Sequence, residues 1–161
     1  MIRVMEVLHQ GEGAGSVTST LHLSLGLARV GFHVRLVCPP GSEVEGRART
    51  AGLEVHPIAL AASGRRANAA TLAAFLDRHP VDLINSHCAK DRAALTSLAL
   101  TRHLRVPLVV TRRQMPRSRF LGNWLVSRLA SRVVAVSRAV GDALVKRGTH
   151  ETSLPLSPMV W

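Results

Sequence analysis

Short apolar runs alternate along the chain with segments in which apolar residues recur at helical spacing. The runs rich in branched apolar residues predict six strands, at residues 2–8, 33–37, 53–58, 81–85, 106–110 and 132–136. The segments between them predict six helices, at residues 17–30, 43–51, 67–79, 89–104, 119–130 and 138–147. Local signals mark some helix ends, since Gly31 follows the first helix while Ser137 and Gly148 flank the last.

This alternation of strand and helix with short connections is typical of an α/β protein whose mainly parallel sheet is covered on both faces. Right-handed crossovers make such a sheet doubly wound and predict the strand order 3-2-1-4-5-6, a Rossmann-like single domain over residues 1–148. In that order the chain reverses direction between the first and fourth strands, where ligands bind at the carboxyl ends. We therefore expect residues 9–16, 86–90 and 111–117 to converge on one edge.

The first predicted strand runs into a glycine-rich loop, HQGEGAGSVTS. Gly11, Gly13 and Gly15 would let backbone N–H groups approach an anion at the start of the first helix, where the helix dipole favours negative charge. A simple tight turn is the alternative. Ser16 stands where the dinucleotide fingerprint needs glycine, and no acid ends the second strand, which disfavours a nicotinamide enzyme. The chain also has neither a GK[ST] nor a GxSxG motif.

Polar residues follow the fourth and fifth predicted strands. Histidine titrates near neutrality, so His87 is a candidate for moving a proton or orienting a hydroxyl, unless it caps the next helix or satisfies a buried backbone group. Lys90 would reach a phosphate or lie solvated on the first helical turn. Thr111, Arg112 and Arg113 are candidate ligand contacts, and at most one of the two adjacent arginines is expected to face the crevice.

Metal ligation is not expected. Cys38 and Cys88 lie far apart and neither has a CxxC partner, which indicates a reducing compartment and argues against a zinc site. His22, His56 and His103 are isolated in the sequence, so we expect them at the surface or in helix packing.

The composition is that of a folded domain, with 47% apolar and 19% charged residues in 161. No apolar run approaches the roughly 18 residues of a spanning helix. The first apolar run carries Glu6 and lacks a small-residue cleavage site, so it predicts a strand and not a signal peptide. We expect the protein to be cytoplasmic.

The net charge of +11 is concentrated in one part of the chain. Residues 102–147 hold eleven basic side chains against the single acid Asp142, and 19 of the 21 basic residues in the whole chain are Arg. Because Arg makes bidentate contacts with phosphate, we expect a phosphorylated or anionic partner, such as nucleic acid, an anionic membrane surface or a nucleotide-bearing substrate. A solvated face in which a GC-rich genome encodes Arg in place of Lys is the alternative. A non-enzymatic basic module for nucleic acid or an anionic membrane is the alternative function. Nucleic acid is disfavoured because aromatic residues make up only 3% of the chain.

Several segments in register resemble the N-terminal, acceptor-side domain of retaining glycosyltransferases of the GT-B architecture, family 4. They are the strand–glycine-loop–helix start, LARVGFHV, LVCPPGS, AGLEVHPI, VDLINSHCAK, VPLVVTRR and SRVVAVSRAVGDALVKRG, which together cover residues 2–148. The resemblance implies transfer of a hexose from a nucleotide-sugar co-substrate to an acceptor hydroxyl, without a metal or another cofactor. The arginine-rich residues 112–132 add the expectation of an anionic lipid, lipopolysaccharide or phosphorylated acceptor, and of a peripheral contact with the inner membrane face.

The resemblance also implies roles for particular residues. By position, Gly13, Ala14 and Gly15 lie beside the donor phosphates and the acceptor, with Val17 where an acid is common. Relatives often end the fourth strand with His-x-His, of which only His87 remains here. Many have Thr-x-His after the fifth strand, where this chain has Thr111-Arg112-Arg113, so the role of that histidine is left open or passes to an arginine.

GT-B enzymes have a second domain that binds the donor, and we expect no counterpart of it within residues 1–161. Residues 149–161 predict an irregular tail. We therefore expect an acceptor half that is inactive alone, whether as a fragment, as a decayed relative or as one half of a split enzyme whose donor domain is a separate chain.

Overall fold

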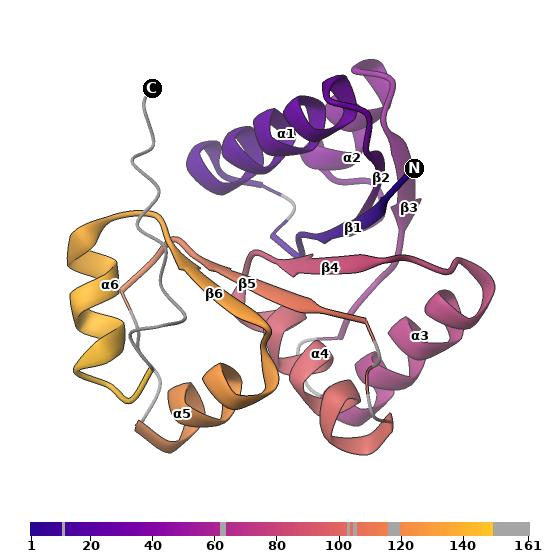
Figure 1. Ribbon diagram of the computed structural model, residues 1–161. Helices are drawn as coiled ribbons and strands as arrows, with labels where there is room; N and C mark the ends of the chain where they lie inside the picture. The colour runs from indigo at the N-terminus through magenta and orange to yellow at the C-terminus, as the bar shows by residue number, and fades with distance from the viewer. Residues whose placement is uncertain (11, 62–63, 103, 105, 116–119, 150–161) are drawn as a thin grey trace.

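The sheet is six-stranded and every neighbouring pair of strands is parallel, as the computed structural model shows (Figure 1). The structure describes residues 1–149 apart from 11, 62–63, 103, 105 and 116–119. The strands are β1 (Arg3–Val7), β2 (His33–Cys38), β3 (Glu54–Pro57), β4 (Leu83–Ser86), β5 (Leu108–Arg112) and β6 (Arg132–Ala135). Their order, β3-β2-β1-β4-β5-β6, confirms the predicted topology.

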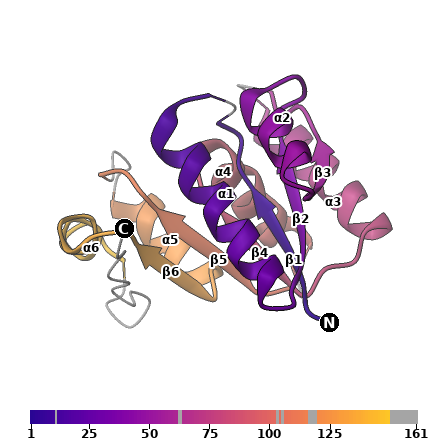
Figure 2. The same cartoon turned by 90° about the horizontal axis from the view of Figure 1, so that it is seen from above.

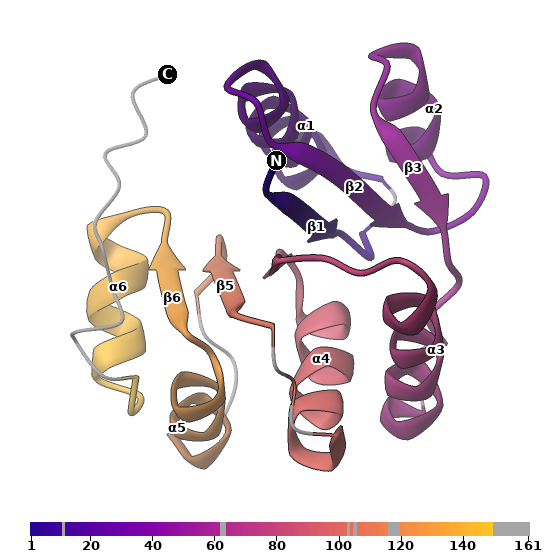
Figure 3. The same cartoon turned by 45° about the vertical axis from the view of Figure 1, so that its right-hand side comes forward.

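Helices follow the strands in strict alternation. They are α1 (Ala14–Arg29), α2 (Glu43–Thr50), α3 (Arg65–Arg78), α4 (Ala89–Arg102), α5 (Phe120–Leu129) and α6 (Arg138–Val145). Figure 3 shows α1 and α2 on one face of the sheet and α3, α4 and α5 on the other. In Figure 2, α6 lies beside β6 at one end of the sheet, and β3 forms the other edge. No described helix is long and apolar enough to cross a bilayer.

The core lies in two layers because successive strand residues point to opposite faces. On the α3–α4 side, Met5, Val7 and Ile84 pack with Leu72 and Leu95. On the α1–α2 side the apolar set is smaller and consists of Leu8, Val17, Leu21, Leu36, Cys38, Val44, Ala48 and Val55. The α1 face of β1 and β4 instead carries polar residues, and these build the site described below.

Two element boundaries differ from the prediction in ways that matter for the site. β5 begins two residues later than expected, after Pro107, which has no N–H to donate to the ladder. The strand also ends two residues later than expected, because Arg112 still pairs with Ala135 of β6, so Arg112 belongs to the strand itself. Helix α1 begins three residues earlier than expected, directly after Gly13, whose φ of 105° favours glycine. The glycine loop is correspondingly short.

Candidate functional site

A cleft of about 360 Å³ opens at the carboxyl ends of β1, β4 and β5. Three segments line it: Gln10 and Ser16 around the start of α1; His87, Cys88, Ala89 and Arg92 after β4; and Thr111, Arg112, Arg113, Gln114 and Met115 at the end of β5. The predicted convergence of these three segments on one edge is thus confirmed. This is the place where the order of a doubly wound sheet reverses and where such sheets bind ligands.

A row of polar side chains crosses the sheet behind this cleft. Glu6 of β1 lies directly beside Asn85 of β4 in the parallel register, and Asn85 Nδ2 donates to Glu6 Oε2 at 3.0 Å. Thr111 of β5 donates to Asn85 Oδ1 at 2.9 Å. All three residues are buried, so the row replaces apolar packing with hydrogen bonds on the face that α1 covers.

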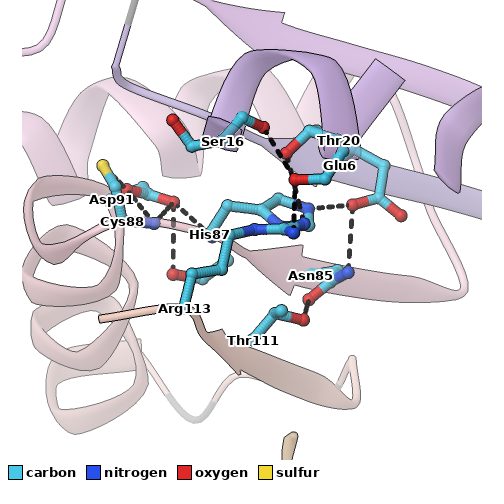
Figure 4. Close-up of polar contacts among 11 residues, drawn as sticks. Glu6, Ser16, Thr20, Asn85, His87, Cys88, Asp91, Thr111 and Arg113 are labelled. Atoms are coloured by element: carbon cyan, nitrogen blue, oxygen red, sulfur yellow. Dashed lines mark hydrogen bonds and ion pairs between the residues drawn. The ribbon is translucent and has the colours of Figure 1, made fainter. Parts of the chain in front are cut away.

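His87 is enclosed between Glu6 and Arg113 (Figure 4). Its Nε2 meets Glu6 Oε2, and Arg113 Nη2 donates to its Nδ1 at 3.1 Å. Since a guanidinium cannot accept a hydrogen bond, Nδ1 is the acceptor and the ring proton sits on Nε2, facing the carboxylate. The His87 side chain has 0% exposed surface, so the residue meets the cleft through its backbone.

Arg113 connects three elements of the fold. Besides His87, its guanidinium donates to Ser19 Oγ and, at 3.5 Å, to Thr20 Oγ1, both on α1. Its Nε is buried and has no hydrogen-bond partner among the described residues. Burial lowers the pKa of Arg113, and the charge of Glu6 opposes that shift. The arginine therefore stays cationic while spanning the gap between the end of β5 and the first helix.

Asp91 fixes the backbone on the far side of His87. Its carboxylate accepts hydrogen bonds from the N–H groups of His87 at 2.8 Å and Cys88 at 3.1 Å, and from the hydroxyl of Ser86. These are N–H groups at the start of α4 that the helix itself cannot satisfy. The Cys88 thiol also contacts this carboxylate, and burial followed by the Asp91 charge raises the pKa of Cys88 to about 11.

Two further guanidinium groups give the cleft its charge. Arg112 points to the opposite face from Arg113 and donates to Asn123 of α5 at 3.3 Å. Burial, together with the charge of Arg92, lowers the pKa of Arg112 to about 10. Among the described residues, the Arg92 guanidinium makes one long contact, of 3.5 Å, with the Cys88 carbonyl. These two cations, Arg112 buried and Arg92 half-buried, are suited to an anionic ligand that would accept hydrogen bonds from their N–H groups.

The other predicted site residues fall in different places. Gly13 precedes α1, while Ala14 and Gly15 occupy its first turn and Ser16 lines the cleft. Gly11 lies outside the described residues. Lys90 stands in the first turn of α4 and is not among the lining residues. Its charge, after burial as the larger cause, helps to lower the pKa of the neighbouring His9 to about 4.

Both adjacent arginines line the cleft, whereas at most one was expected to face it. The reason is that the cleft wraps around the end of β5, so residues on both faces of the strand border it. The divergence of their side chains, expected from strand geometry, is as predicted.

Three contributors were not predicted from the sequence: Glu6, Asp91 and Arg92. Glu6 did give a signal, since a carboxylate interrupts an otherwise apolar buried strand. Asp91 and Arg92 lie on a helix among many polar residues, and nothing in their spacing distinguishes them from solvated positions.

This topology, with a cleft at the switch point beside a helix that begins after a glycine, is that of a doubly wound, Rossmann-like domain. The model of Glycosyltransferase Family 4 matches residues 13–154, and the chain belongs to this family. No curated protein matches the chain.

Solved structures share the fold at low identity. A glycosyltransferase from Rickettsia africae matches with a TM-score of 0.79 at 15% identity, over 96% of this chain and 42% of that one. HepE of Anabaena in complex with UDP and glucose matches with a TM-score of 0.76 at 14% identity, over 97% and 44%. A UDP-N-acetylglucosamine 2-epimerase from Rickettsia bellii matches with a TM-score of 0.68 at 7% identity, over 96% and 44%. The chain therefore spans less than half the length of these GT-B-type proteins.

Proposed function

We propose that this domain is the acceptor-side half of a glycosyltransferase that moves a hexose from a nucleotide-sugar to an acceptor hydroxyl. One observation supports the proposal beyond family membership: three arginines, Arg92, Arg112 and Arg113, line the cleft at the carboxyl ends of β1, β4 and β5. A nucleotide-sugar brings a diphosphate, and its negative charge matches this cleft and the adjacent start of α1. The Anabaena neighbour, described in complex with UDP and glucose, supports a nucleotide-sugar partner.

In this proposal Arg113 meets the substrate charge and His87 acts behind it. His87 was predicted as a catalytic residue, and the enclosure of its ring favours a positioning role instead. Its unprotonated Nδ1 holds one Nη of Arg113, while Glu6 holds the ring proton on Nε2. Hydrogen bonds of this kind, made to Arg113 by a residue that does not touch the substrate, orient the guanidinium and restrict its motion. A water-exposed base is not required for this role.

Transfer also requires a nucleotide-sugar-binding domain, carried on the same polypeptide or on another chain. The solved neighbours are more than twice as long as the stretch they share with this chain, which supports a two-domain arrangement. The domain alone is then expected to bind its acceptor and to turn over no donor.

The acceptor we propose is a hydroxyl on an anionic lipid or lipopolysaccharide. Helix α5, next to the cleft through the Arg112–Asn123 contact, exposes 75% of Leu121 and 42% of Trp124. The Arg128 guanidinium lies 6.0 Å from the centroid of the Trp124 ring. Exposed apolar and aromatic side chains beside a cation are suited to the headgroup region of an anionic bilayer.

The experiment is a transfer assay with this domain and a donor-binding domain together. Labelled UDP- and GDP-hexoses are supplied with lipid extracts, and hexosylated products are identified by mass spectrometry. We expect transfer with both domains present, none with either alone, and a loss of at least about tenfold in Arg113→Gln. The exposed Arg29→Gln, at the end of α1 and away from the cleft, is the matched control for this substitution. Conversion of UDP-N-acetylglucosamine to its 2-epimer without transfer would contradict the proposal.

Acceptor chemistry is tested separately by vesicle flotation. Binding to anionic vesicles should exceed binding to neutral ones and should fall with added salt. Trp124→Ala should weaken it, while Leu23→Ala on the exposed surface of α1 should not. Equal binding to neutral and anionic vesicles would exclude the electrostatic part of this proposal.

A further inference from the structure

A second cluster of titratable side chains surrounds Glu54, on the edge strand β3. Three of the eight histidines of the chain gather there: His33 at the start of β2, His56 two residues after Glu54, and His79 directly after α3. Strand order places β2 and β1 between this edge and β4, so the cluster is separate from the cleft. Nothing in the proposed transfer reaction uses these residues.

The donor atoms of the cluster are close to one another. His56 Nε2 lies 2.6 Å from Glu54 Oε1, and His33 Nε2 lies 2.6 Å from the other carboxylate oxygen. One ligand atom each from Glu54, His56 and His79 fall within 4.8 Å of one another. The His56 and His79 rings have their centroids 4.8 Å apart, and Phe75 stacks on His79 at 4.5 Å. Phe75 thus restrains one of the rings.

Two imidazoles and one carboxylate are a donor set that borderline divalent ions prefer. Around Zn²⁺ with bonds of about 2.0 Å, tetrahedral ligand atoms stand about 3.3 Å apart. The 2.6 Å between His56 Nε2 and Glu54 Oε1 and the 4.8 Å limit on all three separations lie on either side of that value. The side chains of Glu54 and His56 are 35% and 23% exposed, which gives an ion a path from solvent.

We propose that Glu54, His56 and His79 form a binding site for a divalent transition-metal ion of the zinc class. His33, on the second oxygen of Glu54, is placed to hold the carboxylate or to become a fourth ligand. The bound ion would join the edge strand to the end of α3, two segments far apart in sequence. Its role is structural, because it lies away from the cleft.

Arg35 would compete with a metal ion for the carboxylate of Glu54. Its Nε donates to Glu54 Oε1 at 2.9 Å, and its Nη1 donates to the Pro80 carbonyl at 2.9 Å. A metal at Oε1 would have to displace or tolerate this positive charge. The charge of Arg35 should therefore weaken metal binding, and its removal should strengthen it.

The test is a titration of the tag-free chain with Zn²⁺ alone, followed by competition with a chromophoric chelator and by melting temperature. We expect one equivalent to bind and to raise the melting temperature. His56→Gln and His79→Gln should each weaken binding by roughly 100-fold, whereas His22→Gln, on the exposed side of α1, should not change it. Co²⁺ should give the visible spectrum of a tetrahedral site without a thiolate charge-transfer band.

Arg35→Gln makes the test independent of folding losses, because this variant should bind Zn²⁺ more tightly than the original chain. The proposal is overturned if the original chain takes up no Zn²⁺ at tens of micromolar. It is equally overturned if His56→Gln and His79→Gln bind as well as His22→Gln, or if a cobalt–thiolate band places the ion at a cysteine. None of these outcomes depends on glycosyl transfer.

Discussion

Glu6 and His87, 81 residues apart in sequence, meet through a hydrogen bond in which neither side chain has any exposed surface. Each is the partner that makes the burial of the other tolerable, since an isolated buried charge or ring nitrogen would cost several kcal/mol. Asn85 supports the same carboxylate oxygen, and Arg113 closes the network from the cleft side.

Removal of one partner of this pair should be strongly destabilising. His87→Ala leaves the Glu6 carboxylate buried with less support, and we expect a loss of about 3 kcal/mol in the free energy of unfolding. Urea denaturation measures it. The matched control is Asp82→Asn, which weakens the solvent-exposed pair with Arg3 and should cost much less, because water screens that pair. Similar losses in the two variants would contradict this account of the network.

Gly13 and Gly15 should respond to alanine in opposite directions. At Gly13 the φ of 105° strains any side chain, and a Cβ would lie 3.3 Å from Gln10 Nε2, so Gly13→Ala should cost about 1–2 kcal/mol. At Gly15, inside α1, a Cβ would meet nothing within 4 Å, so Gly15→Ala should stabilise the fold by up to about 1 kcal/mol. Thermal melts of the two variants decide this. A melting temperature unchanged by Gly13→Ala would show that the loop relaxes.

His9 should make the fold weaker in mild acid. Its ring is buried and accepts the Leu60 N–H at 2.8 Å, and burial lowers its pKa from 6.5 to about 4. Between these values the unfolded chain binds a proton that the folded chain does not, so stability falls as the pH drops from 6.5 toward 4. Urea midpoints across this range should fall more steeply in the original chain than in His9→Asn. The exposed His22→Asn should follow the original chain.

Cys88 should be a slow nucleophile in the folded state. Burial and the Asp91 carboxylate raise its pKa to about 11 from 9.0, which leaves roughly 100-fold less thiolate at pH 8. Alkylation followed by mass spectrometry should therefore be slow until urea unfolds the chain. Asp91→Asn removes the negative charge and should accelerate labelling at Cys88. Cys38, buried beside Glu45, provides the internal control because its rate should stay the same.

The fold was predictable because the apolar residues of each strand and helix recur with the period of that element. Right-handed crossovers then favour a single order of strands in the sheet. The meeting of His87 and Arg113 followed from that order alone. The Glu6 carboxylate was visible as an interruption of an apolar strand, but its partner was not, because register across β1 and β4 decides which residues face each other.

The grouping of His56 with Glu54 and His79 was missed for a related reason. His56 was expected to be isolated, and in the sequence it is. The end of α3 returns to the edge strand and brings His79 against it, a contact that depends on how the helix lies across the sheet. The spacing of residues along the chain therefore does not predict the contact between His56 and His79.

Arg112 and Arg113 are chemically identical neighbours that differ only in which side of β5 they leave. Arg112 donates to Asn123 on the α5 side of the sheet, and Arg113 donates to Ser19 and His87 on the α1 side. Inserting or deleting a single residue upstream in this strand would turn each guanidinium to the opposite face of the sheet, away from its present partners. A change of two residues would keep each side chain on its present face, so the spacing between Pro107 and the two arginines matters as much as their chemistry.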